Sequence, residues 1–157
     1  MGLKIMIVSF FGHSNFIENE NIKETILTLL EENINGSDVQ FCLGGYGNFD
    51  DFALKCCKEY KSRHKNTSLM FITPYINEWL NNRKEYYQNE YDEIIYPDIE
   101  SAPLKYAISK RNEWIINYSD LIITYVQVRF GGAYNALRYA NRKGKRCINL
   151  IKDFKMD

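Results

Sequence analysis

Short apolar runs alternate with amphipathic segments along nearly the whole chain, and this alternation predicts repeated β–α units. The first run, residues 4–9, carries almost no polar alternation, which is typical of a strand buried on both faces of a parallel sheet. An N-cap at Asn21 and a stop at Asn35-Gly36 delimit the first expected helix. The pattern therefore predicts an α/β protein with a doubly wound, mostly parallel sheet and helices on both faces, in three layers. The further expected strands are 39–43, 68–73, 93–96, 121–125 and 146–150, and the further helices are 50–64, 101–117 and 133–142.

The chain has 157 residues, of which 45% are hydrophobic, and this is enough for one domain with a core. No linker rich in Pro, Gly or Ser interrupts it, so a single domain over residues 1–157 is expected. Residues 74–99 have the least regular pattern. Trp79, Tyr86, Tyr87 and Tyr91 lie there among polar residues.

Lys and Arg number 20 and Asp and Glu number 20, so the formal net charge is zero. A neutral balance spread along the chain argues against bulk nucleic-acid binding and against attraction to anionic membranes. No apolar run reaches the roughly 20 residues that a membrane span requires. The apolar opening is followed by polar chain without a cleavage-like site, so a cytoplasmic protein without a membrane partner is expected.

The four cysteines form no C-x-x-C pair, and His13 and His64 lack the spacing of a metal-binding motif. Neither a metal nor a cofactor is therefore expected. Many aromatic residues, 12 Tyr and 9 Phe, could stack on a base, but a chain rich in Ile, Asn and Lys also fits the bias of a genome poor in G and C.

Three glycine-containing loops follow expected strands: residues 10–14, 44–50 and 129–135. In an open parallel sheet such loops meet at the carboxyl edge, where ligands bind, and a glycine turn before a helix exposes amides that attract phosphate. Each loop alone can be a plain turn; three on one edge favour a binding site. The candidate ligand-binding residues in these loops are Gly12, His13, Gly44, Gly45, Gly47, Asp50, Gly131, Gly132, Ala133, Tyr134 and Asn135.

Known nucleotide motifs match only in part. Gly45-x-Gly47 is followed by Asp50 where the dinucleotide fingerprint has its third glycine, and no loop continues as Gly-Lys-Ser/Thr. Asp50 can cap the helix that follows or bind ribose hydroxyls. Arg111 is suited to a forked contact with phosphate, although it could instead pair with Glu113 or Asp120 on the surface.

Together these residues resemble the SLOG superfamily, the Rossmann-like proteins related to LOG phosphoribohydrolases and to the DNA-processing protein Smf/DprA. The resemblance covers nearly the whole chain and is nearest to small stand-alone members from Gram-positive bacteria and phages. It implies a Rossmann-like fold, a homodimer and a nucleotide-type ligand, and relatives include an antiphage sensor that binds cyclic ADP-ribose-type signals. The motifs that carry the resemblance are Gly12-His13, Gly44-Gly45-Tyr46-Gly47-x-Phe49-Asp50, Ile94-Ile95-Tyr96-Pro97, Lys110-Arg111-Asn112-x-Trp114, Ser119-Asp120, Gly131-Gly132-Ala133 and Lys143-Gly144-Lys145.

The LOG catalytic pattern is only partly present. Arg111 falls on its arginine and Gly131-Gly132 on its paired glycines, but no glutamate stands at its catalytic position. Loss of that carboxylate affects hydrolysis more than binding, so binding of an ADP-ribose-like or cyclic ADP-ribose-type nucleotide, in immunity between phage and host, is the leading hypothesis. The alternative is a phosphoribohydrolase or nucleoside-transferase-like enzyme in which Asp50 or Glu113 replaces the glutamate. A module that acts through protein partners is a third possibility. The departures are Phe130 for the proline, Tyr134 for the third glycine, Asn135 for the threonine, and Leu137 and Arg138 around the glutamate position.

A homodimer is also expected from the aromatic residues between Tyr75 and Tyr96, because a contiguous exposed aromatic patch is typical of an interface. Alternatively, Trp79, Tyr86 and Tyr87 could cover the ligand as a lid.

Overall fold

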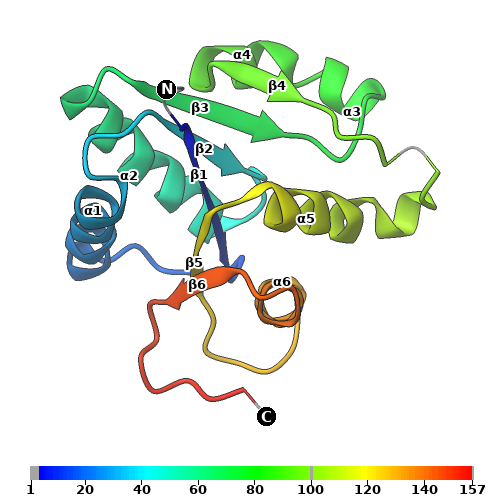
Figure 1. The fold of residues 1–157 in the computed structure, drawn as a ribbon. Helices are drawn as coiled ribbons and strands as arrows, with labels where there is room; N and C mark the ends of the chain where they lie inside the picture. Colours follow the sequence, from blue (N-terminus) through cyan, green and yellow to red (C-terminus); the bar gives the residue numbers. More distant parts are fainter. Residues whose placement is uncertain (1–3, 100, 157) are drawn as a thin grey trace.

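A computed structural model describes residues 4–99 and 101–156 and shows one six-stranded, all-parallel sheet (Figure 1). The strand order is β4-β3-β2-β1-β5-β6, so the chain builds outward from β1 to β4 and then crosses to the other side of β1. This doubly wound arrangement confirms the expected fold class. The strands are β1 (Met6–Gly12), β2 (Val39–Leu43), β3 (Thr67–Ile72), β4 (Glu93–Ile95), β5 (Leu121–Tyr125) and β6 (Arg146–Asn149).

The helices cover both faces of the sheet (Figure 1). Val8, Phe10 and Phe41 point to the face that packs against α1 and α2, whereas Ile7 and Ile122 point to the face covered by α5 and α6. Successive side chains of β1 therefore pack alternately into two separate hydrophobic cores, one on each face of the sheet. The helices are α1 (Glu20–Ile34), α2 (Asn48–Arg63), α3 (Glu78–Asn81), α4 (Lys84–Glu90), α5 (Ala107–Tyr118) and α6 (Gly132–Arg142), with a 3-10 turn at Leu104–Tyr106.

Helix ends differ in part from the sequence-based expectation. Asn19, rather than Asn21, caps α1, and its side chain accepts hydrogen bonds from the amides of Asn21 and Ile22. The expected stop is confirmed, because Asn35 adopts the left-handed conformation with φ 49°. The helices α3 and α4, inside residues 74–99, were not expected.

Met1–Leu3, Glu100 and Asp157, all inside the expected 1–157 domain, lie outside the described residues. In the part of the chain that the structure describes, no helix is long and apolar enough to cross a membrane.

Candidate functional site

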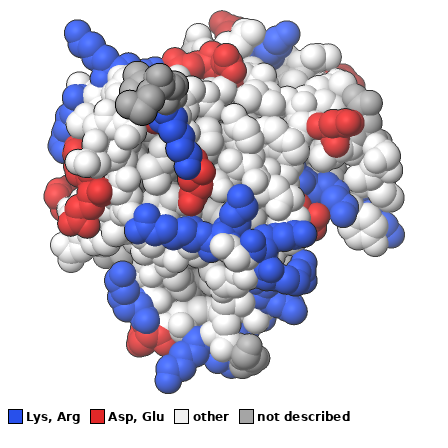
Figure 2. All heavy atoms as spheres, viewed as in Figure 1, with Lys and Arg blue, Asp and Glu red and all other residues white. Residues whose placement is uncertain are grey.

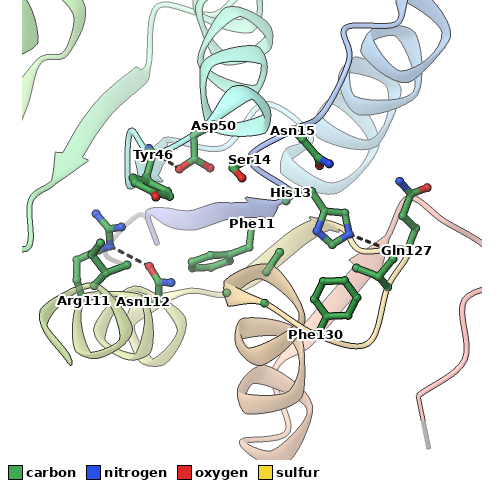
Figure 3. A pocket seen from close by; sticks show the side chains of 16 residues that line it. Phe11, His13, Ser14, Asn15, Tyr46, Asp50, Arg111, Asn112, Gln127 and Phe130 are labelled. Atoms are coloured by element: carbon green, nitrogen blue, oxygen red, sulfur yellow. Dashed lines mark hydrogen bonds between the residues drawn. The ribbon is translucent and has the colours of Figure 1, made fainter. Parts of the chain in front are cut away.

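A cavity of about 400 Å³ opens where the strand order reverses, at the carboxyl ends of β1 and β5 (Figure 3). This is the place where open parallel sheets bind their ligands. The loop after β1, the loop between β2 and α2, α5 and the loop between β5 and α6 all contribute to its wall. The lining residues are Phe11, Gly12, His13, Ser14, Asn15, Tyr46, Asp50, Ile108, Arg111, Asn112, Gln127, Val128, Phe130, Gly131, Gly132 and Ala133.

The start of α6 presents free backbone donors to this cavity. Gly131 is the N-cap residue with φ 92°, a conformation that favours glycine, and no side chain caps the helix. No amide from Gly132 to Tyr134 donates to a described residue, because the first bond of the helix runs from the Asn135 amide to the Gly131 carbonyl. A Cβ added at Gly132 would meet no atom within 4 Å. The helix end is therefore open to a ligand and carries the positive end of the helix dipole.

Asp50 lies in the first turn of α2 and is only 8% exposed. It is not the N-cap residue that the sequence predicted, because Gly47 holds that position. Its Oδ2 instead reaches back and accepts a hydrogen bond of 2.8 Å from the Tyr46 amide. Burial raises the pKa of Asp50 to about 7, although the Tyr46 amide and the charge of Arg111 favour the ionised form. The cavity thus contains a carboxyl group that can change charge near neutral pH.

Arg111 is 2% exposed and holds together the loops behind the cavity. Its Nη1 donates to the carbonyl oxygens of Gly44 (3.0 Å) and Ile72 (2.8 Å), and its Nε donates to Asn112 Oδ1 (2.9 Å). Of the three Arg111 side-chain nitrogens, only Nη2 has no hydrogen-bond partner among the described residues. The surface ion pairs considered from the sequence are absent there, since Glu113 pairs with Lys110 and Asp120 with Lys4. A forked contact with phosphate would have to displace a bond that Arg111 makes to the protein.

His13 has a defined protonation state in this arrangement. Its Nε2 lies 2.9 Å from the backbone nitrogen of Gln127. A backbone N–H can only donate, so Nε2 accepts and the neutral ring carries its proton on Nδ1. Partial burial lowers the pKa of His13 and so favours this neutral form. His13 joins the loops after β1 and β5 and leaves one N–H donor at the cavity (Figure 3).

The glycines of the middle loop, Gly44, Gly45 and Gly47, lie outside the cavity lining, and the structure explains them by packing. A Cβ at Gly44 would lie 2.8 Å from Arg111 Cζ, and one at Gly45 would lie 2.6 Å from the Phe71 ring. Gly45 and Gly47 also have positive φ values of 63° and 90°. Their role as ligand-binding residues remains a prediction.

Other expected site residues lie apart from the cavity lining. Tyr134 is buried and packs edge-on against Phe154, and Asn135 is exposed on α6. Neither they nor Glu113 lines the cavity, and the same holds for the aromatic residues of 75–96. Nine lining residues were not among the predicted site residues: Phe11, Ser14, Asn15, Tyr46, Ile108, Asn112, Gln127, Val128 and Phe130. Four of them, Phe11, Ser14, Tyr46 and Phe130, lie inside the three glycine loops, so loop membership was the signal that could have found them.

Charge is distributed unevenly, contrary to the expectation of an even balance. Residues 101–157 contain 11 Lys and Arg but only 4 Asp and Glu. Figure 2 shows basic side chains gathered on the face over the end of α6 and the start of β6. Four exposed cations there form no ion pair with a described acidic residue; we call them the basic face, and they are Arg138, Arg142, Lys143 and Arg146.

No known protein-family profile matches the chain. Its sequence is similar to the uncharacterized SPbeta prophage-derived protein YoqJ of Bacillus subtilis strain 168, with 27% identity over 158 residues that cover 87% of this chain and 91% of YoqJ.

Three solved structures resemble the fold. DNA processing protein A (DprA) from Helicobacter pylori, described for its single-stranded DNA binding mode, matches 90% of this chain with 19% identity and a TM-score of 0.58. TM1055 matches 90% of this chain and 72% of its own with 12% identity and a TM-score of 0.56, and DprA from Streptococcus pneumoniae matches 99% with 10% identity and a TM-score of 0.50. The chain spans less than two thirds of the two DprA chains, 63% and 64%. These likenesses show that the chain shares a Rossmann-like α/β fold with the two DprA structures and with TM1055.

Proposed function

We propose that the protein binds a phosphorylated nucleoside in the cavity at the carboxyl ends of β1 and β5, with the phosphate at the start of α6. The observation that carries this proposal is the uncapped N-terminus of α6, where Gly132 faces open space inside a cavity of about 400 Å³. Free amides and the helix dipole favour an anion at this position. A volume of this size falls within the usual range for small-ligand pockets, roughly 300–1,000 Å³.

The apolar part of the wall suits a base. Phe11 lies between the two sides of the cavity, and Phe130, which is 73% exposed, stands beside the glycines that precede α6 (Figure 3). An exposed aromatic side chain at a cavity mouth is available for stacking. Among nucleotides we favour ADP-ribose-like and cyclic ADP-ribose-type signals, on the SLOG resemblance.

Gly132 provides the test of phosphate binding. Gly132→Val places a branched side chain over the amides and should abolish binding of AMP or ADP-ribose in a calorimetric titration. Gly132→Ala should fold at least as stably as the parent, because its Cβ would enter open space and alanine favours a helix more than glycine does. Asn141→Val, at the far end of α6, is the matched control and should bind normally. Full affinity in Gly132→Val would refute the phosphate position.

The enzyme alternative, cleavage of an N-glycosidic bond, is supported by one of the two carboxylates considered for it. Asp50 lines the cavity with a pKa of about 7, a value that suits acid–base chemistry, whereas Glu113 does not line it. Incubation with AMP tests this alternative by chromatography. Free adenine from the parent but not from Asp50→Asn would favour an enzyme over a binding module.

A second candidate function, binding of single-stranded nucleic acid, is favoured by the basic face. Phosphate contacts by Lys and Arg dominate such binding and make it dependent on salt. Neighbouring aromatic rings could stack on bases. The ring centres of Trp114 and Tyr118 lie 5.0 Å apart, and the Tyr139 ring lies beneath the cationic groups of Arg142 and Lys143. The similarity to DprA, described for single-stranded DNA binding, agrees with this proposal.

Charge reversal tests the basic face. Arg142→Glu with Arg146→Glu should abolish binding of a labelled oligonucleotide in fluorescence anisotropy at low salt. The control, Lys65→Glu with Lys84→Glu, makes the same change in charge elsewhere and should retain most of the binding. Equal losses in both double variants would mean that net charge alone, and not this face, attracts the oligonucleotide.

A homodimer remains a proposal with a smaller aromatic patch than expected. Tyr86 is 55% exposed, but Tyr87 is buried and stacks on Phe71 with ring centres 3.8 Å apart. Light scattering at micromolar concentration tests the dimer, and a monomer would refute it.

A further inference from the structure

Two buried polar side chains in the cavity have hydrogen-bonding capacity that the protein does not use. Asp50 Oδ2 is engaged by the Tyr46 amide, whereas Oδ1 has no partner among the described residues. The unpartnered polar atoms that have no accessible surface do not include Oδ1. Oδ1 is therefore accessible, and it faces the cavity that Asp50 lines. The same holds for Arg111, whose Nη1 and Nε are engaged while Nη2 is not. An unused acceptor and an unused donor therefore belong to one cavity.

This pair is rigidly held. Asp50 is fixed by its bond to a loop amide in the first turn of α2, and Arg111 is fixed by carbonyl oxygens at the ends of two strands, Gly44 and Ile72. Neither residue can turn away to solvent, because their exposed fractions are 8% and 2%. Buried polar groups of this kind cost free energy when they stay unpaired, so a ligand that pairs with them gains affinity.

The chemistry of the pair selects one kind of ligand group. A carboxylate repels a phosphate, so the phosphate belongs at the α6 end of the cavity and an uncharged donor belongs near Asp50. A hydroxyl both donates and accepts, and it can therefore donate to Asp50 Oδ1 while accepting from Arg111 Nη2. Figure 3 shows Asp50 and Tyr46 on the α2 side of the cavity, across from Phe130 and the start of α6.

We infer that Asp50 and Arg111 form a hydroxyl-recognition subsite that makes the cavity selective for ribose over 2′-deoxyribose. This inference rests on the proposed binding of a phosphorylated nucleoside and adds its sugar class. A 2′-deoxy ligand would leave the buried acceptor of Asp50 without a partner, and sites built to bond a hydroxyl discriminate strongly against analogues that lack it.

The test compares AMP with 2′-deoxy-AMP, and ribose 5-phosphate with 2-deoxyribose 5-phosphate, by calorimetric titration of the full chain at about pH 8. This pH lies above the Asp50 pKa of about 7, so the carboxylate is ionised. The parent should bind each ribose form about 10- to 100-fold more tightly, the range expected for losing a hydrogen bond to a charged group. The phosphosugars show whether the preference persists without a base. Equal affinity for ribose and deoxyribose forms would overturn the inference and leave the proposed function intact, whereas no binding of any probe would overturn both.

Asp50→Ala separates recognition from a structural role. The variant should lose the preference for ribose while binding 2′-deoxy-AMP at least as well as the parent, because a negative group has been removed from the site. Asp50→Asn keeps the shape and an amide that can bond a hydroxyl, so it serves if Asp50→Ala does not fold, and it should retain a reduced preference. The role of the carboxylate would be refuted if either Asp50→Ala or Asp50→Asn kept the full parental preference for ribose. It would also be refuted if the variant lost affinity for the ribose and deoxyribose ligands by the same factor.

Discussion

Replacing Asp50 with asparagine should stabilise the protein above neutral pH. In the folded chain Asp50 has a pKa of about 7, mainly because burial disfavours its charged form, whereas its ordinary value is 3.8. Each pKa unit corresponds to about 1.4 kcal/mol, so ionising Asp50 costs the folded state roughly 4 kcal/mol. Asparagine is nearly the same shape, cannot ionise, and can still accept the hydrogen bond from the Tyr46 amide.

The sign of the pH dependence follows from proton binding. Between pH 3.8 and about 7 the folded state keeps the Asp50 proton that the unfolded state has lost. The Asp50 contribution to the free energy of unfolding is therefore greatest below pH 3.8 and falls as the pH rises through this window. Arg111 opposes the fall and Asp51 adds to it, because these charges act on Asp50.

Urea denaturation at about pH 5 and about pH 8 measures this contribution. Asp50→Asn should gain stability relative to the parent at the higher pH, by an amount of order 4 kcal/mol less any loss from the altered hydrogen bond. Asp51→Asn is the matched control, since it removes a carboxylate from the same helical turn but from an exposed position, and its effect should be much smaller. If Asp50→Asn and the parent change in parallel with pH, Asp50 ionises freely and the reasoning is wrong.

Three further substitutions test the packing behind the cavity, each by chemical denaturation. Arg111→Lys should cost about 2 to 3 kcal/mol, because an ammonium cannot maintain the bonds to both Gly44 and Ile72; a loss below about 0.5 kcal/mol would contradict a buried structural role. Gly44→Ala should cost about 1 to 3 kcal/mol through its contact with the guanidinium, and less in an Arg111→Lys background, so additive costs would refute that contact. Gly12→Ala should be more harmful still, because its Cβ would lie 2.2 Å from the Phe49 ring; wild-type stability would show that the ring moves freely.

Local patterns determined much of the fold. The strands at 39–43 and 121–125 were predicted with the residues that the structure assigns to them, because buried parallel strands are continuous apolar runs bounded by turn residues. The end of α1 at Asn35-Gly36 was also predictable from the local sequence, because Asn and Gly readily adopt the left-handed conformation that ends a helix. The cavity edge followed from the rule that ligand loops meet at the carboxyl ends of parallel strands.

The chemistry of the site depended on the tertiary structure. The sequence predicts Arg111 as a phosphate ligand or as a surface ion-pair residue. Only the approach of two distant carbonyl groups, 67 and 39 residues away in sequence, makes it a buried anchor. The pKa of Asp50 likewise depends on burial, which is set by the packing of α2 and not by the neighbouring letters. The loop glycines likewise differ in ways that the sequence does not show. Gly44 is required because the Arg111 guanidinium packs against it, whereas Gly132 faces open space. Such contacts join residues far apart in the chain, so sequence spacing carries no trace of them.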